Sequence, residues 1–169
     1  PFLDVPHNWN FAVEGVTSIS MDLHKYAYCP KGISIILYSC KEYSDYSGFV
    51  KDDWNGGIYA THALTGSRCG NIVAQSWATM MYYGLDGYKT QANKLQQAVV
   101  KIRDTFKHVE DIYVIGNPSI CVVAFGSYTL DIYKINEKMK SREWFLNELQ
   151  YPASIHICVT QNHVPLVDM

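Results

Sequence analysis

The sequence has few charged residues and no excess of either sign. Charged types make up 18% of the 169 residues, with 14 basic side chains against 16 acidic ones and a formal net charge of −2. Disorder requires low hydrophobicity with high charge, so this composition argues against a disordered chain. A protein that binds nucleic acid is expected to carry a basic stripe, which this balance does not provide. We therefore expect a globular chain without a nucleic-acid partner.

Paired cysteine motifs and long hydrophobic runs are also missing. The five cysteines are widely spaced without a C-x-x-C pair, and the histidines show no metal-ligand spacing. We therefore expect neither a metal site nor a redox motif, and the pattern suits a reducing compartment. No apolar stretch approaches the roughly 20 residues of a membrane helix, so we expect no membrane segment in this chain.

Aromatic side chains, in contrast, are abundant. The sequence holds 13 tyrosines and four tryptophans. Aromatic rings combine a large apolar area with a polar tip, so they suit interfaces and pocket walls as well as cores. The count therefore fits an ordinary aromatic-rich core first, and a subunit interface or ligand pocket second.

The first half of the chain predicts two strands, a long loop and a buried helix. Residues 16–20 alternate and residues 33–38 form a continuous apolar run, which predicts a short strand followed by a buried one. Residues 44–68 lack a clean period and are rich in glycine, as is typical of a functional or interface loop. Residues 72–83 are apolar almost all round, which predicts a buried helix that ends near Gly84.

The second half predicts a long helix followed by a small α/β lobe. Apolar residues recur at spacings of four and three from Tyr88 to Phe106, which predicts an amphipathic helix. Asp131 is placed to cap a second helix that continues to about Lys140. Short apolar runs predict three strands, at residues 112–115, 120–125 and 155–160.

The strongest chemical signal lies between the first two predicted strands. His24 and Lys25 stand side by side there, and Lys31 follows six residues later. A lysine whose amine is kept neutral by desolvation and nearby cations can form a Schiff base. A lone His-Lys pair is usually solvated surface, so these residues by themselves leave both interpretations open.

The surrounding sequence resembles a cofactor-lysine signature. The string Ser18-x-Ser20-x-Asp22-x-His24-Lys25-Tyr26 is similar to that of pyridoxal-phosphate enzymes of the group II decarboxylase type. Further motifs stand in the order found in the sphingosine-1-phosphate lyase family, over nearly the whole chain. These motifs are Gly15–Ser20, Pro30-Lys31-Gly32, Leu37-Tyr38-Ser39, Asp53–Ala60, Gly66-Ser67-Arg68, Gly116-Asn117-Pro118 and Pro152–His156.

The resemblance implies an α/β fragment of a fold type I pyridoxal-phosphate-dependent transferase, similar to aspartate aminotransferase. Residues 1–105 would form the C-terminal part of the large cofactor-binding domain, and residues 106–169 part of the small C-terminal domain. The resemblance also implies a homodimer whose active site is shared between subunits. The glycine-rich loop of residues 44–68 would then be exchanged between the two copies.

The same resemblance assigns cofactor-binding roles to individual residues. Lys25 matches the lysine that holds pyridoxal 5'-phosphate through a Schiff base, and His24 matches its neighbour on the cofactor phosphate. Ser67 matches a residue that reaches the cofactor phosphate of the partner subunit. Gly56 and Gly57, which lack side chains, would allow a close backbone approach.

Lys31 and Tyr59 match residues at the substrate end, where a cation and a hydroxyl suit a phosphate-bearing headgroup. The implied reaction cleaves a carbon–carbon bond of a phosphorylated sphingoid base and gives phosphoethanolamine and a long-chain aldehyde, in sphingolipid catabolism. Lys25 is a candidate for one of the proton transfers.

Two alternatives remain at this point. A pyridoxal-phosphate-dependent amino-acid decarboxylase would use the same lysine but release carbon dioxide. A truncated, inactive chain is the other, because the family residue that pairs with the cofactor's pyridine nitrogen is expected upstream of Pro1. The resemblance also implies the endoplasmic reticulum membrane, facing the cytosol, for a eukaryotic parent and the cytoplasm otherwise.

Overall fold

The computed structural model describes residues 2–3 and 8–167 and divides them into two compact units. One unit contains residues 8–84, and the other contains residues 85–167 together with residues 2–3. The Phe2 ring belongs to the second unit because it stacks on Tyr88, with the ring centroids 4.9 Å apart. The predicted domain boundary between residues 105 and 106 concerns the domains of the whole fold and stays a prediction.

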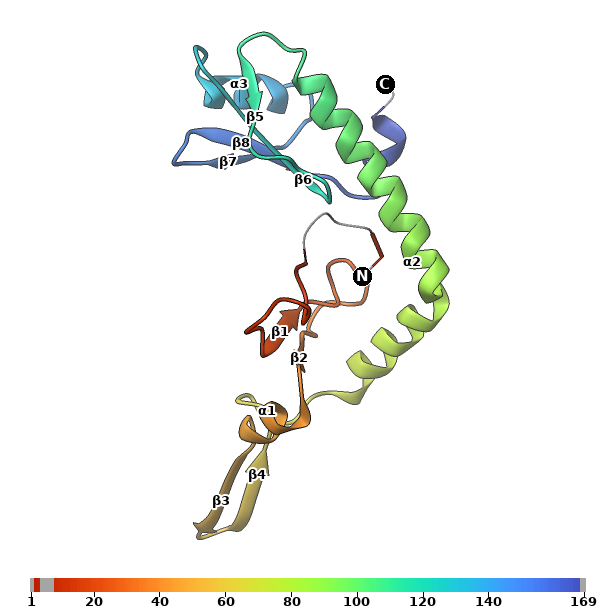
Figure 1. Cartoon of the computed structure of the whole chain (residues 1–169), viewed down its shortest axis with the longest axis vertical. Coiled ribbons are helices and arrows are strands. Elements are labelled where there is room, and N and C mark those ends of the chain that lie inside the picture. Colours follow the sequence, from red (N-terminus) through yellow and green to blue (C-terminus); the bar gives the residue numbers. More distant parts are fainter. Residues whose placement is uncertain (1, 4–7, 168–169) are drawn as a thin grey trace. The chain divides into compact units, whose positions relative to one another are not determined.

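Helix α2 (Gly70–Phe106) contributes to both units and is interrupted at Gly84 (Figure 1). Gly84 has φ 57° and ψ −176°, a combination that a residue with a side chain adopts only under strain. The two helices predicted on either side of this glycine are therefore confirmed. Burial of the first of them is not: Trp77, Met81 and Tyr82 are 63%, 64% and 85% exposed, since the described residues cover only one side of it.

In the first unit, β1 (Ser18–Met21) pairs antiparallel with β2 (Ile35–Tyr38) in the register Ser18↔Tyr38. The two predicted strands are confirmed, but the second is not buried, because Ile36 and Leu37 are 53% and 43% exposed. This two-stranded ladder buries neither face of β2 within the described residues, so a continuous apolar run does not suffice for burial.

The predicted long loop of residues 44–68 is wrong. Helix α1 (Lys41–Tyr46) leads into a hairpin of β3 (Phe49–Trp54) and β4 (Gly57–Thr61). Asn-Gly is a strong hairpin-turn signal when strand-forming residues flank it, and it occurs here at residues 55–56 between aromatic and β-branched neighbours. Gly57 follows with φ 102°, a conformation that favours glycine.

In the second unit, four strands form an antiparallel sheet in the order β5–β6–β8–β7 (Figure 1). The strands are β5 (Ile112–Val114), β6 (Val122–Ser127), β7 (Asn147–Leu149) and β8 (Ser154–Cys158), and a short 3-10 helix covers Val164–Leu166. The three predicted strands correspond to β5, β6 and β8. Strand β7 was not predicted, because its sequence Asn-Glu-Leu contains no apolar run and no β-branched residue.

The core of this unit lies between the sheet and the second half of α2. Val99 of α2, Val123 of β6 and Ile155 of β8 are fully buried. The predicted apolar face of residues 88–106 is therefore confirmed at its centre, where Leu95 and Val99 pack into this core.

Helix α3 (Ile132–Lys140) begins as the sequence predicts. The Asp131 side chain accepts hydrogen bonds from the backbone N–H groups of Tyr133 and Lys134, which confirms it as the N-cap. Asn136, which is fully buried, donates from Nδ2 to Glu148 Oε1 at 2.8 Å. This contact ties α3 to β7.

Candidate active site

The loop that carries Lys25 is fixed by its own backbone hydrogen bonds. The Lys25 N–H donates to the Asp22 carbonyl at 3.1 Å, and the Cys29 N–H donates to the Leu23 carbonyl at 3.1 Å. Leu23 and Cys29 are both buried, at 6% exposure. These bonds fold residues 22–29 into a compact turn that directs two apolar side chains inward and leaves Lys25 outside.

The first half of α2 packs against the buried side of this loop. The Cys29 thiol lies 3.7 Å from the carbonyl oxygen of Ser76, a buried residue of α2. The rings of Tyr28 and Tyr83 lie 5.3 Å apart. β1, β2 and α2 thus hold the lysine loop at both of its ends and along its inner side.

Lys25 and His24 are brought together around one carboxylate. The Lys25 Nζ, on a side chain that is 63% exposed, lies 3.0 Å from Asp22 Oδ2. His24 Nε2 lies 3.9 Å from the same oxygen, and its Nδ1 lies 3.2 Å from the Ile33 carbonyl oxygen. Because a carbonyl oxygen only accepts, that contact assigns the proton of a neutral His24 to Nδ1.

Asp22 is an ionised group in this cluster. The Ser34 hydroxyl donates a hydrogen bond to Asp22 Oδ1. This bond, followed by the one from Lys25, holds the pKa of the Asp22 carboxyl below its ordinary value, although partial burial acts in the opposite direction. The sequence did not predict the contacts of Asp22 with Lys25 and Ser34. The three-residue spacing from Asp22 to Lys25 could have indicated the first of these contacts.

The other predicted site residues lie elsewhere in the first unit. Gly56, Gly57 and Tyr59 belong to the β3–β4 hairpin, which extends away from β1 and β2 in Figure 1. Tyr59 packs edge-on against Trp54 at 6.4 Å, and a side chain at Gly56 would collide with that same Trp54 ring. The hairpin therefore does not join the Lys25 cluster within one copy of the chain.

Lys31 and Ser67 are exposed on connecting segments. Lys31 lies at the end of the lysine loop, just before β2. Ser67 lies between the hairpin and α2, in a stretch without regular secondary structure. Both side chains are reachable from solvent, as groups that bind a phosphate must be before the ligand arrives.

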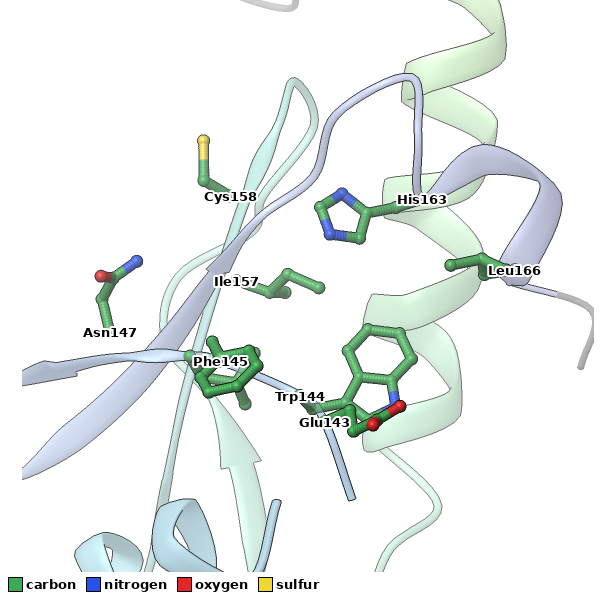
Figure 2. A pocket seen from close by; sticks show the side chains of 9 residues that line it. Glu143, Trp144, Phe145, Asn147, Ile157, Cys158, His163 and Leu166 are labelled. Atoms are coloured by element: carbon green, nitrogen blue, oxygen red, sulfur yellow. The ribbon is translucent and has the colours of Figure 1, made fainter. Parts of the chain in front are cut away.

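A separate cavity of about 280 Å³ lies in the second unit (Figure 2). Trp144, Phe145, Ile157 and His163 are among its lining residues. The Trp144 and His163 rings stack at 6.3 Å, and His163 Nδ1 already accepts the Thr160 N–H at 2.9 Å. None of the predicted site residues lines this cavity, and no lysine is among its lining residues.

The described residues contain no group of three or more His, Cys, Asp or Glu side chains arranged to hold a metal ion. Among the same residues no helix is both long and apolar enough to cross a bilayer.

The Lys25 cluster fits pyridoxal phosphate chemically. Schiff-base formation needs a primary amine that the aldehyde can reach, and the Lys25 amine is solvent-accessible at a fixed position. A phosphate group needs cationic or N–H donors, which His24 and Lys31 provide on the same loop. The donor set is therefore compatible with this cofactor.

No family model matches the chain, but known proteins do. It is 44% identical over 160 residues to the sphingosine-1-phosphate lyase of Arabidopsis thaliana, covering 95% of this chain and 29% of the relative. It is 41% identical over 155 residues to sphingosine-1-phosphate lyase 1 of Rattus norvegicus, covering 92% of this chain and 27% of the relative. The chain thus spans less than a third of the length of these relatives.

Two solved structures resemble the fold. The Burkholderia pseudomallei sphingosine-1-phosphate lyase matches with a TM-score of 0.87 and 35% identity, over 92% of this chain and 35% of that one. A Lactobacillus brevis glutamate decarboxylase matches with a TM-score of 0.78 at 16% identity, over 99% of this chain and 41% of that one, which shows a shared fold. The predicted α/β fold, as a fragment of the fold type I architecture, is confirmed. Over the segment that it spans, the chain is similar to sphingosine-1-phosphate lyases along 92–95% of its own length.

Proposed function

We propose that this chain is part of a pyridoxal-phosphate-dependent aldehyde lyase. The enzyme would cleave phosphorylated sphingoid bases to phosphoethanolamine and a long-chain aldehyde, in sphingolipid catabolism. The observation that carries this proposal is the accessible Lys25 amine, fixed beside His24 in a chain similar to sphingosine-1-phosphate lyases along 92–95% of its length. The names of those relatives supply the substrate class.

Each residue of the Lys25 loop would have a role that follows from its chemistry. Pyridoxal phosphate, when bound at Lys25, supplies an electron sink for the bond that breaks. The Nδ1–H of His24 faces the Ile33 carbonyl oxygen. His24 would therefore donate a hydrogen bond to a phosphate through Nε2 only when the ring is an imidazolium. Lys25, once its amine is free, would move a proton at the reacting carbon.

The substrate end would be built from Lys31 and Tyr59. A phosphate headgroup is held best by charge-assisted hydrogen bonds, which an ammonium and a phenol can donate. Tyr59 lies on the hairpin and not beside Lys25 in the same copy. We therefore propose that the hairpin of one subunit completes the site of another.

The exposed surface of the hairpin supports this homodimer. Phe49, Val50 and Ile58 are 55%, 65% and 77% exposed. An isolated two-stranded hairpin is marginally stable in water, so a partner surface over these side chains would stabilise it. Gly56 and Gly57 would bring the hairpin turn close to the partner's cofactor, and Ser67 would bind its phosphate. Without that second copy, and with under a third of the relatives' length, we expect the 169-residue chain alone to be inactive.

A eukaryotic parent would act at the endoplasmic reticulum membrane, facing the cytosol, and any other parent in the cytoplasm. The decarboxylase alternative rests on fold alone, since the glutamate decarboxylase structure shares only 16% identity.

The test uses the complete protein that contains this segment. Lys25→Arg keeps the charge but removes a competent primary amine, so aldehyde release should fall by about 10²–10⁴-fold. Lys41→Arg is the matched control, because Lys41 pairs with Asp45 on exposed α1 and should leave the rate unchanged. Borohydride reduction with pyridoxal phosphate, followed by peptide mass spectrometry, should place the label on Lys25.

Two outcomes would reject the proposal. The first is release of aldehyde by the Lys25→Arg variant at the wild-type rate, and the second is a phosphopyridoxyl label on another lysine. Either result would show that Lys25 does not take part in the reaction. Release of carbon dioxide in place of the aldehyde would establish the decarboxylase instead.

A further inference from the structure

The cavity of the second unit combines aromatic walls with one carboxylate. Trp144, Phe145 and His163 contribute rings to it, and Ile157 lies among them (Figure 2). The described lining residues include one acid, Glu143. We propose that this cavity binds an organic cation, namely an alkylammonium group of the size of a lysine side chain. The inference goes beyond the proposed function, because it concerns residues that the proposed function does not use.

A tight turn after α3 holds the carboxylate in place. The Glu143 N–H donates to the Lys140 carbonyl at 3.0 Å. The Trp144 N–H donates to the Met139 carbonyl, also at 3.0 Å, and the two bonds together form a Schellman motif. Glu143 occupies the left-handed position of this motif, with φ 66°, where glycine is the usual residue. The chain therefore keeps a charged side chain at this wall of the cavity although a glycine would be less strained there.

The charges around the cavity favour a cation. The described lining residues include no lysine or arginine. His163 is neutral in this geometry, because the Thr160 N–H donates to its Nδ1 at 2.9 Å and that nitrogen must therefore carry a lone pair. Among the described residues, none forms a hydrogen bond or an ion pair with the Glu143 carboxylate. A cationic ligand would thus meet an unpaired negative charge and no positive one.

The aromatic rings and the size of the cavity narrow the class of ligand. A cation is attracted to the face of an aromatic ring, and most strongly to that of tryptophan. Cavities that enclose a whole small-molecule ligand measure about 300–1,000 Å³, whereas this one measures about 280 Å³. It therefore suits a single ammonium-bearing chain, whose methylene groups would pack on Ile157 and Leu166. Such a group occurs in a free amine and in the lysine side chain of another protein.

Three four-carbon probes test the charge preference on the complete protein that contains this segment. n-Butylammonium, 1-butanol and butyrate have similar shapes and differ in charge. The methyl NMR signal of isotopically labelled Ile157, a residue that lines the cavity and is 8% exposed, reports binding at this place. We expect a millimolar dissociation constant for n-butylammonium, about three- to tenfold tighter binding than that of 1-butanol, and the weakest binding for butyrate.

Two substitutions separate the carboxylate from the rings. Glu143→Gln should weaken binding of n-butylammonium by about two- to fivefold and leave that of 1-butanol unchanged. Phe145→Leu, at a position that is 78% exposed, keeps an apolar wall without a ring and should weaken n-butylammonium by a similar factor. Glu137→Gln is the matched control, because Glu137 is an exposed acid of α3 that does not line the cavity. Its affinities should equal those of the wild type.

Several results would overturn the inference. These are an Ile157 signal that n-butylammonium does not shift, equal or tighter binding of 1-butanol or butyrate, and wild-type affinity for n-butylammonium in Glu143→Gln. If a variant does not fold, the comparison of the three probes on the wild type decides. None of these results depends on Lys25, so the proposed function stands or fails separately.

A peptide with one lysine between neutral residues identifies the source of the cation. Binding tighter than that of n-butylammonium would support a lysine of a partner protein, because the peptide backbone then adds contacts. Equal or weaker binding would support a free amine.

Discussion

Two neighbouring valines of β6 allow a direct test of the core of the second unit. Val123 is fully buried and pairs with Ile157 of β8, whereas the adjacent Val122 is 42% exposed. Val→Ala removes two methyl groups at either position. At Val123 the lost burial is about 0.8 kcal/mol per carbon, and a cavity term adds to it. We therefore expect Val123→Ala to lower the free energy of unfolding by about 2–3 kcal/mol, and Val122→Ala by less than about 1 kcal/mol.

Urea denaturation followed by the fluorescence of Trp144, with Trp9, Trp54 and Trp77 replaced by Phe, measures both variants, because Trp144 packs against the same core. An unchanged dependence of stability on urea concentration would show that the substitution acts on the folded state. Equal losses for the two valines would refute the reasoning, since they would mean that the difference in burial between the two faces of β6 does not determine the loss of stability.

Two further contacts in this unit are testable. Asp131→Ala should cost about 1 kcal/mol of stability through loss of the α3 N-cap, while Asp131→Asn should be nearly neutral; equal losses in thermal unfolding would contradict the capping role. Hydrogen bonds from Arg103 and then Lys107 lower the pKa of Asp104 to about 2. This stabilisation is present above about pH 4 and is lost as the pH falls toward 2. Carbon-detected NMR titration should show that pKa, and Arg103→Ala should raise it; a wild-type pKa near 3.8 would contradict the pairing.

Periodicity predicted the parts of the fold whose signal lies within the element itself. The second half of α2 has one apolar face, and that face meets β6 and β8 of the same unit. The Asp131 cap is more local still, because its partners are the next helical residues. Such elements are fixed by interactions that a single sequence displays.

Burial was harder to predict, because it depends on what covers an apolar side chain. The first half of α2 and strand β2 are both rich in apolar residues, yet Trp77 and Ile36 are more than half exposed. In the first unit, the described residues cover only one side of that helix, where the Cys29 thiol faces the Ser76 carbonyl oxygen. Hydropathy describes the tendency to be covered and not the presence of a cover.

The candidate site shows the same division between local and distant information. His24 and Lys25 are adjacent, so their motif was visible in the sequence. Ser34 is twelve residues from Asp22, and only the closure of the loop by the β1–β2 ladder brings its hydroxyl to that carboxylate. Two residues that meet through such a loop closure have no fixed spacing in the sequence from which their contact could be predicted. Asp22 connects the two levels, because its turn spacing to Lys25 is local and its anchoring by Ser34 is not.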